Sequence, residues 1–194
     1  MSGLTSPKQA TATESGRVLL EVRELVTEFS TRNGVARAVG GVDLTLREGE
    51  IVGLVGESGS GKSVTGFSIL GLVDAPGRVA SGSVRFRGRE LVGLAEADLR
   101  ELRGRDIAII FQDPMMTLNP VLRIDTQLVE TILAHERVPR AEALDRARRV
   151  LEEVGIPAAA ERLKAYPHQL SGGMRQRVVI AMALLHRPAL IIAD

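Results

Sequence analysis

Cysteine is missing from all 194 residues of this chain. Its absence excludes disulfide bonds, catalysis by a thiolate and zinc sites built on cysteine ligands. A chain without cysteine is compatible with a reducing compartment but does not require one. Histidine is scarce as well, and the three present, His135, His168 and His186, do not stand at metal-ligand spacing. We therefore expect each histidine to be a surface or capping residue.

Long apolar runs and a strong excess of one charge are also missing. No window approaches the roughly 20 uncharged apolar residues of a membrane-spanning helix. The formal net charge of +1 gives no reason to expect a nucleic-acid surface. Residues 1–16 are polar and lack the apolar segment of a signal peptide, so we expect a disordered tail there. Apolar residues nevertheless make up 44 % of the chain, which is enough for a core.

Apolar patterning predicts the strands. Half-buried strands alternate apolar and polar side chains, whereas strands covered on both faces are short continuous apolar runs. The run IVGLV at residues 51–55 and the run IAIIF at 107–111 are of the second kind. In all, we expect strands at residues 19–25, 36–46, 51–55, 82–86, 107–111 and 190–193.

Helices are expected between these strands. Leu144, Ala147, Leu151 and Val154 recur at helix spacing, and Gly155 follows as a stop signal. Further helices are predicted at residues 62–72, 95–102 and about 172–185. Buried strands that alternate with helices imply an α/β core with a parallel sheet, and the early alternating strands suggest a small antiparallel sheet beside it.

A phosphate-binding motif follows the run at 51–55. The segment GESGSGKS fits G-x-x-x-x-G-K-[ST], and its fixed positions coincide by chance in fewer than about 1 chain in 100 of this length. Its glycines let successive N–H groups point inward, and the following helix start adds unpaired donors. Lys62 would reach the β- and γ-phosphates, and the Ser63 hydroxyl would ligate Mg²⁺. The predicted nucleotide-binding residues here are Gly56, Glu57, Ser58, Gly59, Ser60, Gly61, Lys62 and Ser63.

A second glycine-rich segment opens the helix at 172–185. Ser171 is a good N-cap residue, but Gly172 and Gly173 in the first helical turn are unfavourable by up to about 1 kcal/mol each. One interpretation is a flexible loop with a capping serine. The other is close approach of the bare backbone to an anion. The residues alone leave both interpretations open.

Three further segments resemble the ATPases of the ABC family. LSGGMRQR at residues 170–177 is similar to the family's signature motif, FQDPMMTLNP at 111–120 to its glutamine loop, and ALIIAD at 189–194 to its Walker B strand. Three stretches further resemble the ATP-binding subunits of oligopeptide, dipeptide and nickel importers: GESGSGKS at 56–63, FQDPMMTLNPVLRI at 111–124 and YPHQLSGGMRQRVVIAMAL at 166–184. The resemblance implies an ABC ATPase domain over residues 17–194. Its expected fold is an α/β, P-loop NTPase (RecA-like) core with a small antiparallel β subdomain and a helical subdomain at about 113–185.

The resemblance also assigns roles. Lys62, Gln112 and Asp194 would be the catalytic residues, with Ser63, Gln112 and Asp194 at Mg²⁺. A carboxylate buried at a strand end is costly without a cation, and the metal would compensate Asp194. Ser171, Gly172 and Gly173 would close on ATP held by the opposite subunit. The family stacks an aromatic ring on adenine where Phe29 falls, with a core phenylalanine as the alternative.

The family pattern continues past Asp194. A glutamate that polarises the attacking water, a further strand and a switch histidine would follow it. We therefore expect a truncated chain without the C-terminal part of the domain, with an exposed sheet edge, weak nucleotide binding and negligible turnover. A mature short protein is the alternative.

The resemblance predicts the ATP- and Mg²⁺-dependent motor subunit of an importer for peptides or nickel. It would be peripheral at the cytoplasmic face of the inner membrane, bound to transmembrane permease subunits and paired with a second, identical or paralogous ATP-binding subunit. A soluble ABC ATPase without a transport role is disfavoured, because the chain is a single cassette without heptads in 113–185. A non-catalytic nucleotide-binding regulator is disfavoured by Lys62 and Ser63.

Overall fold

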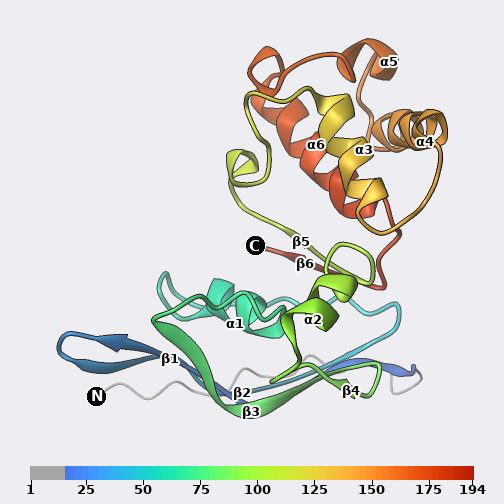
Figure 1. Cartoon of the computed structure of the whole chain (residues 1–194). Helices are drawn as coiled ribbons and strands as arrows, with labels where there is room; N and C mark the ends of the chain where they lie inside the picture. Colours follow the sequence, from blue (N-terminus) through green and yellow to red (C-terminus); the bar gives the residue numbers. More distant parts are fainter. Residues whose placement is uncertain (1–15) are drawn as a thin grey trace. The chain divides into compact units, whose positions relative to one another are not determined.

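The computed structural model describes residues 16–194, which form two compact units that divide between Ala95 and Glu96 (Figure 1). The predicted tail at residues 1–16 lies outside the described residues except for Gly16. The carbonyl of Gly16 accepts a hydrogen bond from Arg47 Nη1 at 2.7 Å. Each unit has its own sheet and its own helices.

The first unit is built on an antiparallel sheet with strand order β2-β1-β3-β4. Its strands are β1 (Val18–Thr31), β2 (Gly34–Arg47), β3 (Gly77–Phe86) and β4 (Arg89–Glu90). The strands expected at residues 19–25, 36–46 and 82–86 are confirmed, and each is longer than expected. The predicted strands ended where alternation ended, but hydrogen bonding to the central strand β1 carries β2 and β3 further.

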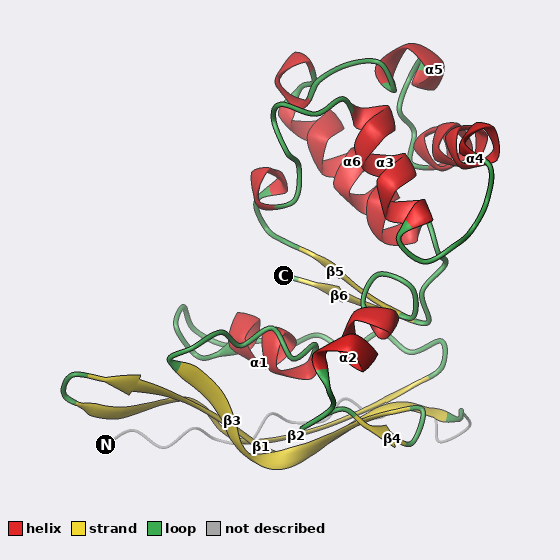
Figure 2. Ribbon diagram, viewed as in Figure 1, coloured by secondary structure: helices red, strands yellow, loops and turns green. Residues whose placement is uncertain are grey.

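Helix α1 (Lys62–Ile69) covers one face of this sheet (Figure 2). Val22, Leu25 and Val84 are fully buried on that sheet. The buried hydroxyls of Thr27 on β1 and Ser68 on α1 lie 2.7 Å apart and share a hydrogen bond. Two polar groups placed inside an apolar layer must pair, so this bond fixes α1 against the middle of β1.

The strand expected at residues 51–55 is wrong. These residues form no strand, and Ile51 and Val55 are 98 % and 94 % exposed. An apolar run becomes a buried strand only where a neighbouring strand takes its N–H and C=O groups. Among residues 16–194 no strand pairs with this segment, so the apolar run does not form a strand.

The second unit combines a parallel strand pair with a cluster of helices. Its elements are α2 (Glu96–Leu102), β5 (Ile107–Ile110), the 3₁₀ helix η1 (Pro114–Met116), α3 (Ile124–Leu133), α4 (Arg140–Glu153), α5 (Ala159–Arg162), the 3₁₀ helix η2 (Pro167–Gln169), α6 (Gly172–Leu184) and β6 (Leu190–Ala193). Strands β5 and β6 pair in parallel from Ile107 opposite Leu190 to Ile110 opposite Ala193. The predicted strands at 107–111 and 190–193 and their parallel pairing are confirmed.

Helices α3, α4 and α6 share one hydrophobic core. Ala143, Ala147 and Leu151 recur at helix spacing on α4 and are fully buried, as are Leu128 and Ile132 on α3. Burying each leucine or isoleucine contributes about 1.5–3 kcal/mol, so this shared core stabilises the packing of the three helices. Within residues 16–194 no helix has the length and apolar character needed to cross a bilayer.

Candidate functional site

The loop before α1 curls around the side chain of Lys62. Lys62 Nζ donates to the carbonyl oxygens of Gly56 (2.9 Å) and Glu57 (2.8 Å), and it lies 3.5 Å from Ser60 Oγ. A further turn is closed by the N–H of Ser60, which donates to Glu57 O at 3.2 Å. The ammonium group is therefore held at the centre of the loop that the motif predicted.

Gly61 is the residue that this loop cannot replace. Its φ is +90°, and a Cβ atom at this position would lie 2.3 Å from the backbone oxygen of Ala38 on β2. Both the left-handed backbone and the close approach require glycine. As the N-cap residue of α1, Gly61 supplies no side-chain acceptor to the first-turn N–H groups. Its carbonyl instead accepts from the N–H and the hydroxyl of Thr65, both at 2.8 Å.

These features fit a polyphosphate. A helix N-terminus carries partial positive charge and unpaired N–H donors, and a lysine adds a full charge with three donors. Ser63 stands at the second position of α1, and its hydroxyl is of the type that magnesium prefers. The predicted phosphate-binding residues, Gly56 to Ser63, thus form one continuous loop and helix start, and their contact with a nucleotide stays a prediction.

Phe29 lies in the same unit, on β1. It pairs with Ala36 of β2 and with Gly77 of β3. The ring is half-buried, and its Cε1 atom would lie only 2.5 Å from a Cβ at Gly77. The ring therefore rests on the bare backbone of Gly77. Stacking of Phe29 on adenine stays a prediction.

Gln112 and Asp194 both follow the carboxyl end of a strand in the second unit's strand pair. Gln112 follows the end of β5 by two residues, and Asp194 directly follows β6. The Asp194 N–H donates to Ile110 O at 2.9 Å, so the carboxyl ends of the two strands lie side by side. Asp194 is exposed, not buried as the apolar run before it suggested. Its predicted magnesium shared with Ser63 of the first unit stays a prediction.

The second glycine-rich helix start is capped by its own serine. Ser171 Oγ accepts a hydrogen bond from the N–H of Met174 at 3.3 Å. Gly172 and Gly173 are exposed, and a Cβ added to either would meet no atom within 4 Å. Within the described chain, no close approach explains why these two residues are glycines.

The two arginines that follow have different surroundings. Arg177 is exposed, and its Nη1 donates to the carbonyl of Gly155 at 2.6 Å, which ties the end of α4 to α6. Arg175 is partly buried, and its Nη1 lies 3.6 Å from the sulfur of Met115. Each of these arginines therefore contacts a residue far along the chain.

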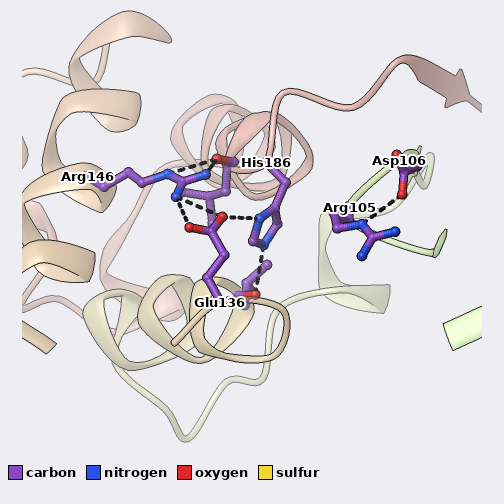
Figure 3. A network of polar contacts seen from close by, with 7 residues as sticks. Arg105, Asp106, Glu136, Arg146 and His186 are labelled. Carbon is purple, nitrogen blue, oxygen red and sulfur yellow. Dashed lines mark hydrogen bonds and ion pairs between the residues drawn. The ribbon is translucent and has the colours of Figure 1, made fainter. Parts of the chain in front are cut away.

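His186 is not the surface residue that was one of the two expectations for each histidine. Its side chain is only 1 % exposed, and it lies in a network with Glu136 and Arg146 (Figure 3). His168 is an exposed surface residue as expected, with its ring stacked on Tyr166 at 5.6 Å. The hydrogen-bond partners of His186 stand 50 and 55 residues earlier, at Glu136 and Thr131, and no local pattern marks them. Sequence reasoning therefore missed this network.

The chain is similar to known proteins over most of its length. Residues 39–194 match the model of a protein family described as ABC transporter. The chain is 50 % identical to the oligopeptide transport ATP-binding protein OppD of Salmonella typhimurium over 183 residues, 94 % of this chain and 54 % of that protein. It is 47 % identical to the dipeptide transport ATP-binding protein DppD of Escherichia coli over 176 residues, 91 % of this chain and 54 % of that protein. The chain thus spans about half the length of the curated relatives it matches.

Solved structures agree on the fold. The dimeric structure of MJ0796, described as a bacterial ABC transporter cassette, has a TM-score of 0.78 and 29 % identity over 91 % of this chain and 73 % of that one. A post-hydrolysis state of the same cassette, bound to ADP and Pi, has a TM-score of 0.79. The predicted P-loop NTPase fold class is confirmed.

Proposed function

Because the chain belongs to the ABC transporter family, we propose that it is the nucleotide-binding part of a motor subunit that hydrolyses ATP to drive peptide import. The observation that carries the proposal is the loop around Lys62, closed by two carbonyl contacts and opening onto the start of α1. Peptides are favoured over nickel because the relatives compared above are named for oligopeptide and dipeptide transport.

The residues of the loop bind and orient the nucleotide. Lys62 exchanges its contacts with Gly56 and Glu57 for phosphate oxygens, since a triphosphate is a stronger acceptor than a carbonyl. Ser63, Gln112 and Asp194 are the predicted magnesium-side residues, and the metal would neutralise charge on the transferred phosphate. Gln112 and Asp194 suit a shared task because they follow two paired strand ends.

A second ATP-binding subunit, identical or paralogous, completes the site. Gly172 and Gly173 weaken the first turn of α6 without any neighbour inside the described chain that demands glycine. Ser171, Gly172 and Gly173 therefore suit close approach of a phosphate held by the other subunit. The helical subdomain at about residues 113–185 would carry this segment toward it.

The permease would dock near the glutamine loop. Met116 and Val121 are 74 % and 75 % exposed in this segment. The buried side chain of Gln127 on α3 shapes it, accepting from Asn119 N–H at 2.8 Å and donating to the carbonyls of Asn119 and Leu122 at 3.0 Å. A firmly held loop with apolar tips suits a protein partner. Such docking would place the subunit at the cytoplasmic face of the membrane.

The test uses the complete subunit in membranes with its permease and a peptide-binding protein. We expect K62A to lower ATP hydrolysis and uptake of a labelled tripeptide at least about 100-fold, because charge stabilisation at the transferred phosphate is the main catalytic contribution. K164A, an exposed lysine in the second unit, is the matched control and should leave both rates unchanged.

Three results would contradict the proposal. Equal rates of ATP hydrolysis by K62A and the parent would show that the loop does not contribute to catalysis. Uptake of radioactive nickel but not of peptide would show that the transported substrate is nickel and not a peptide. Hydrolysis without any permease dependence would favour a soluble ABC ATPase.

A further inference from the structure

His186 lies between two hydrogen-bond acceptors. Its Nδ1 lies 2.8 Å from Glu136 Oε1, and its Nε2 lies 3.0 Å from the backbone oxygen of Thr131. A neutral imidazole carries a single N–H, so it can satisfy only one of these acceptors. The other nitrogen would then face an acceptor with its own lone pair. Only the doubly protonated ring donates in both directions.

Two helix ends meet at this cluster. Thr131 lies in the last turn of α3, and the N–H of His135 donates to Ile132 O, not to Thr131 O. His186 therefore caps α3. The carbonyl of Leu185, at the end of α6, accepts from both Nε and Nη2 of Arg146 (Figure 3). A helix C-terminus carries partial negative charge, which stabilises a cation at each of these positions.

The charged groups around His186 are a carboxylate that accepts from its ring and cations that lie farther out. Glu136 accepts from Arg146 Nη1 through both oxygens, at 2.9 and 2.7 Å, and these bonds hold the pKa of its carboxyl below the usual value of 4.5. His135 lies edge-on to His186, with ring centroids 5.1 Å apart. Burial first, and then the positive charges of His186 and Arg105, lower the pKa of His135. Asp106, ion-paired with Arg105 at 2.8 Å, is the remaining charge facing His135.

We propose that His186, held as an imidazolium between Glu136 and the Thr131 carbonyl, is a positioning residue that fixes the junction between α6 and β6. This junction matters because the segment that crosses it begins at Ser171–Gly173 and ends at Asp194. At β6 the same junction is fastened by the N–H groups of Ala189 and Leu190, which donate to Asp106 O at 3.0 and 3.2 Å. The catalytic part of this inference rests on the proposed function.

The first measurement reads the protonation of the ring without any substitution. Nitrogen NMR of the chain labelled at its histidine rings should show two protonated nitrogens for His186 at about pH 6.5, where exposed histidines are half-charged. The exposed ring of His168 gives the reference signal in the same spectrum. A single tautomer with one bare nitrogen at His186 under these conditions would overturn the proposal.

The second measurement compares unfolding of the parent and H186Q across pH. Glutamine keeps a donor but cannot take up a proton, so the advantage of the parent should decline as the pH rises and its ring loses the second N–H. The ratio of unfolding constants should change by up to about tenfold per pH unit while the ring loses its second N–H. The pair is repeated in an H135Q background, which removes the neighbouring titration. A pH-independent ratio in both backgrounds contradicts the proposal.

The third measurement separates this inference from the proposed function. In the complete subunit, H186Q should lower kcat several-fold near neutral pH while KM for ATP changes less than about twofold, because Lys62 and its loop are untouched. The loss in kcat should shrink as the pH rises. If neither the parent nor H186Q hydrolyses ATP, the proposed function fails. The NMR and unfolding measurements then still test the role of His186 at the junction. If the parent hydrolyses ATP and H186Q equals it at every pH, the positioning role is wrong.

Discussion

The two glycine-rich helix starts, at α1 and at α6, look alike in sequence but differ in what their glycines do. Gly61 has a φ of +90° and meets the Ala38 carbonyl so closely that no side chain fits. Gly172 and Gly173 face open space, and Ser171 caps the helix they begin. The first start is therefore shaped by its own fold. The second is left bare, as expected for a surface that receives a ligand from outside.

The largest effect should come from G61A. A left-handed alanine and its contact with the Ala38 carbonyl should cost about 3 kcal/mol of unfolding free energy. Urea unfolding of the parent and G61A measures this directly. G59A is a graded control, because its φ is +80° but a Cβ there meets no atom within 4 Å. Equal loss in G59A and G61A would show that the close approach to β2 contributes nothing.

A smaller loss should follow from S171A. It removes the acceptor for the Met174 N–H, and loss of such a cap costs about 1 kcal/mol. S171D should restore most of the stability, because aspartate is an equally good N-cap residue. The comparison of the two helix starts fails if S171A unfolds at the same urea concentration as the parent.

The smallest change at a helix start, of opposite sign, should come from G173A. Alanine is favoured over glycine within a helix by up to about 1 kcal/mol, and nothing nearby obstructs its Cβ. We therefore expect unchanged or slightly higher stability together with a clear loss of ATP hydrolysis in the complete subunit. A G173A protein that hydrolyses ATP at the parental rate would contradict the proposal that the bare backbone at Gly173 approaches a phosphate.

The C-terminal ends of α1 and α6 also differ, and this difference predicts how stability depends on pH. At the C-cap of α1 the Leu70 N–H donates to Gly66 O. At α6 the last carbonyl is held by Arg146, which also lowers the pKa of Glu136. A carboxyl with a lower pKa when folded adds stability above its unfolded pKa and loses it as the pH falls through the folded value. The stability advantage of the parent over E136Q should thus shrink below about pH 4.5. An advantage that is flat from neutral pH to about pH 3 would contradict this.

Local patterns predicted much of the fold, and distant partners explain the rest. Alternation predicted the strands around Val22 and Leu44. Helix spacing predicted α4 with its buried Ala147 and Leu151, although Leu144 of the same pattern is 39 % exposed. The strand predicted at residues 51–55 was wrong because a strand needs a hydrogen-bonded neighbour, and the apolar pattern of one segment does not reveal whether a neighbour is present. The loop around Lys62 was predictable because its contacts are all within six residues. The burial of His186 was not, because its partners lie 50 and 55 residues away.

The most direct test of the central claim is a nucleotide-binding titration of the parent, K62A and G173A with fluorescent ATP and Mg²⁺. If the loop before α1 is the nucleotide site of this chain, K62A should bind at least about tenfold more weakly, through loss of a charge-assisted contact, while G173A binds like the parent. Equal binding by K62A and the parent, or weaker binding by G173A than by K62A, would contradict the account.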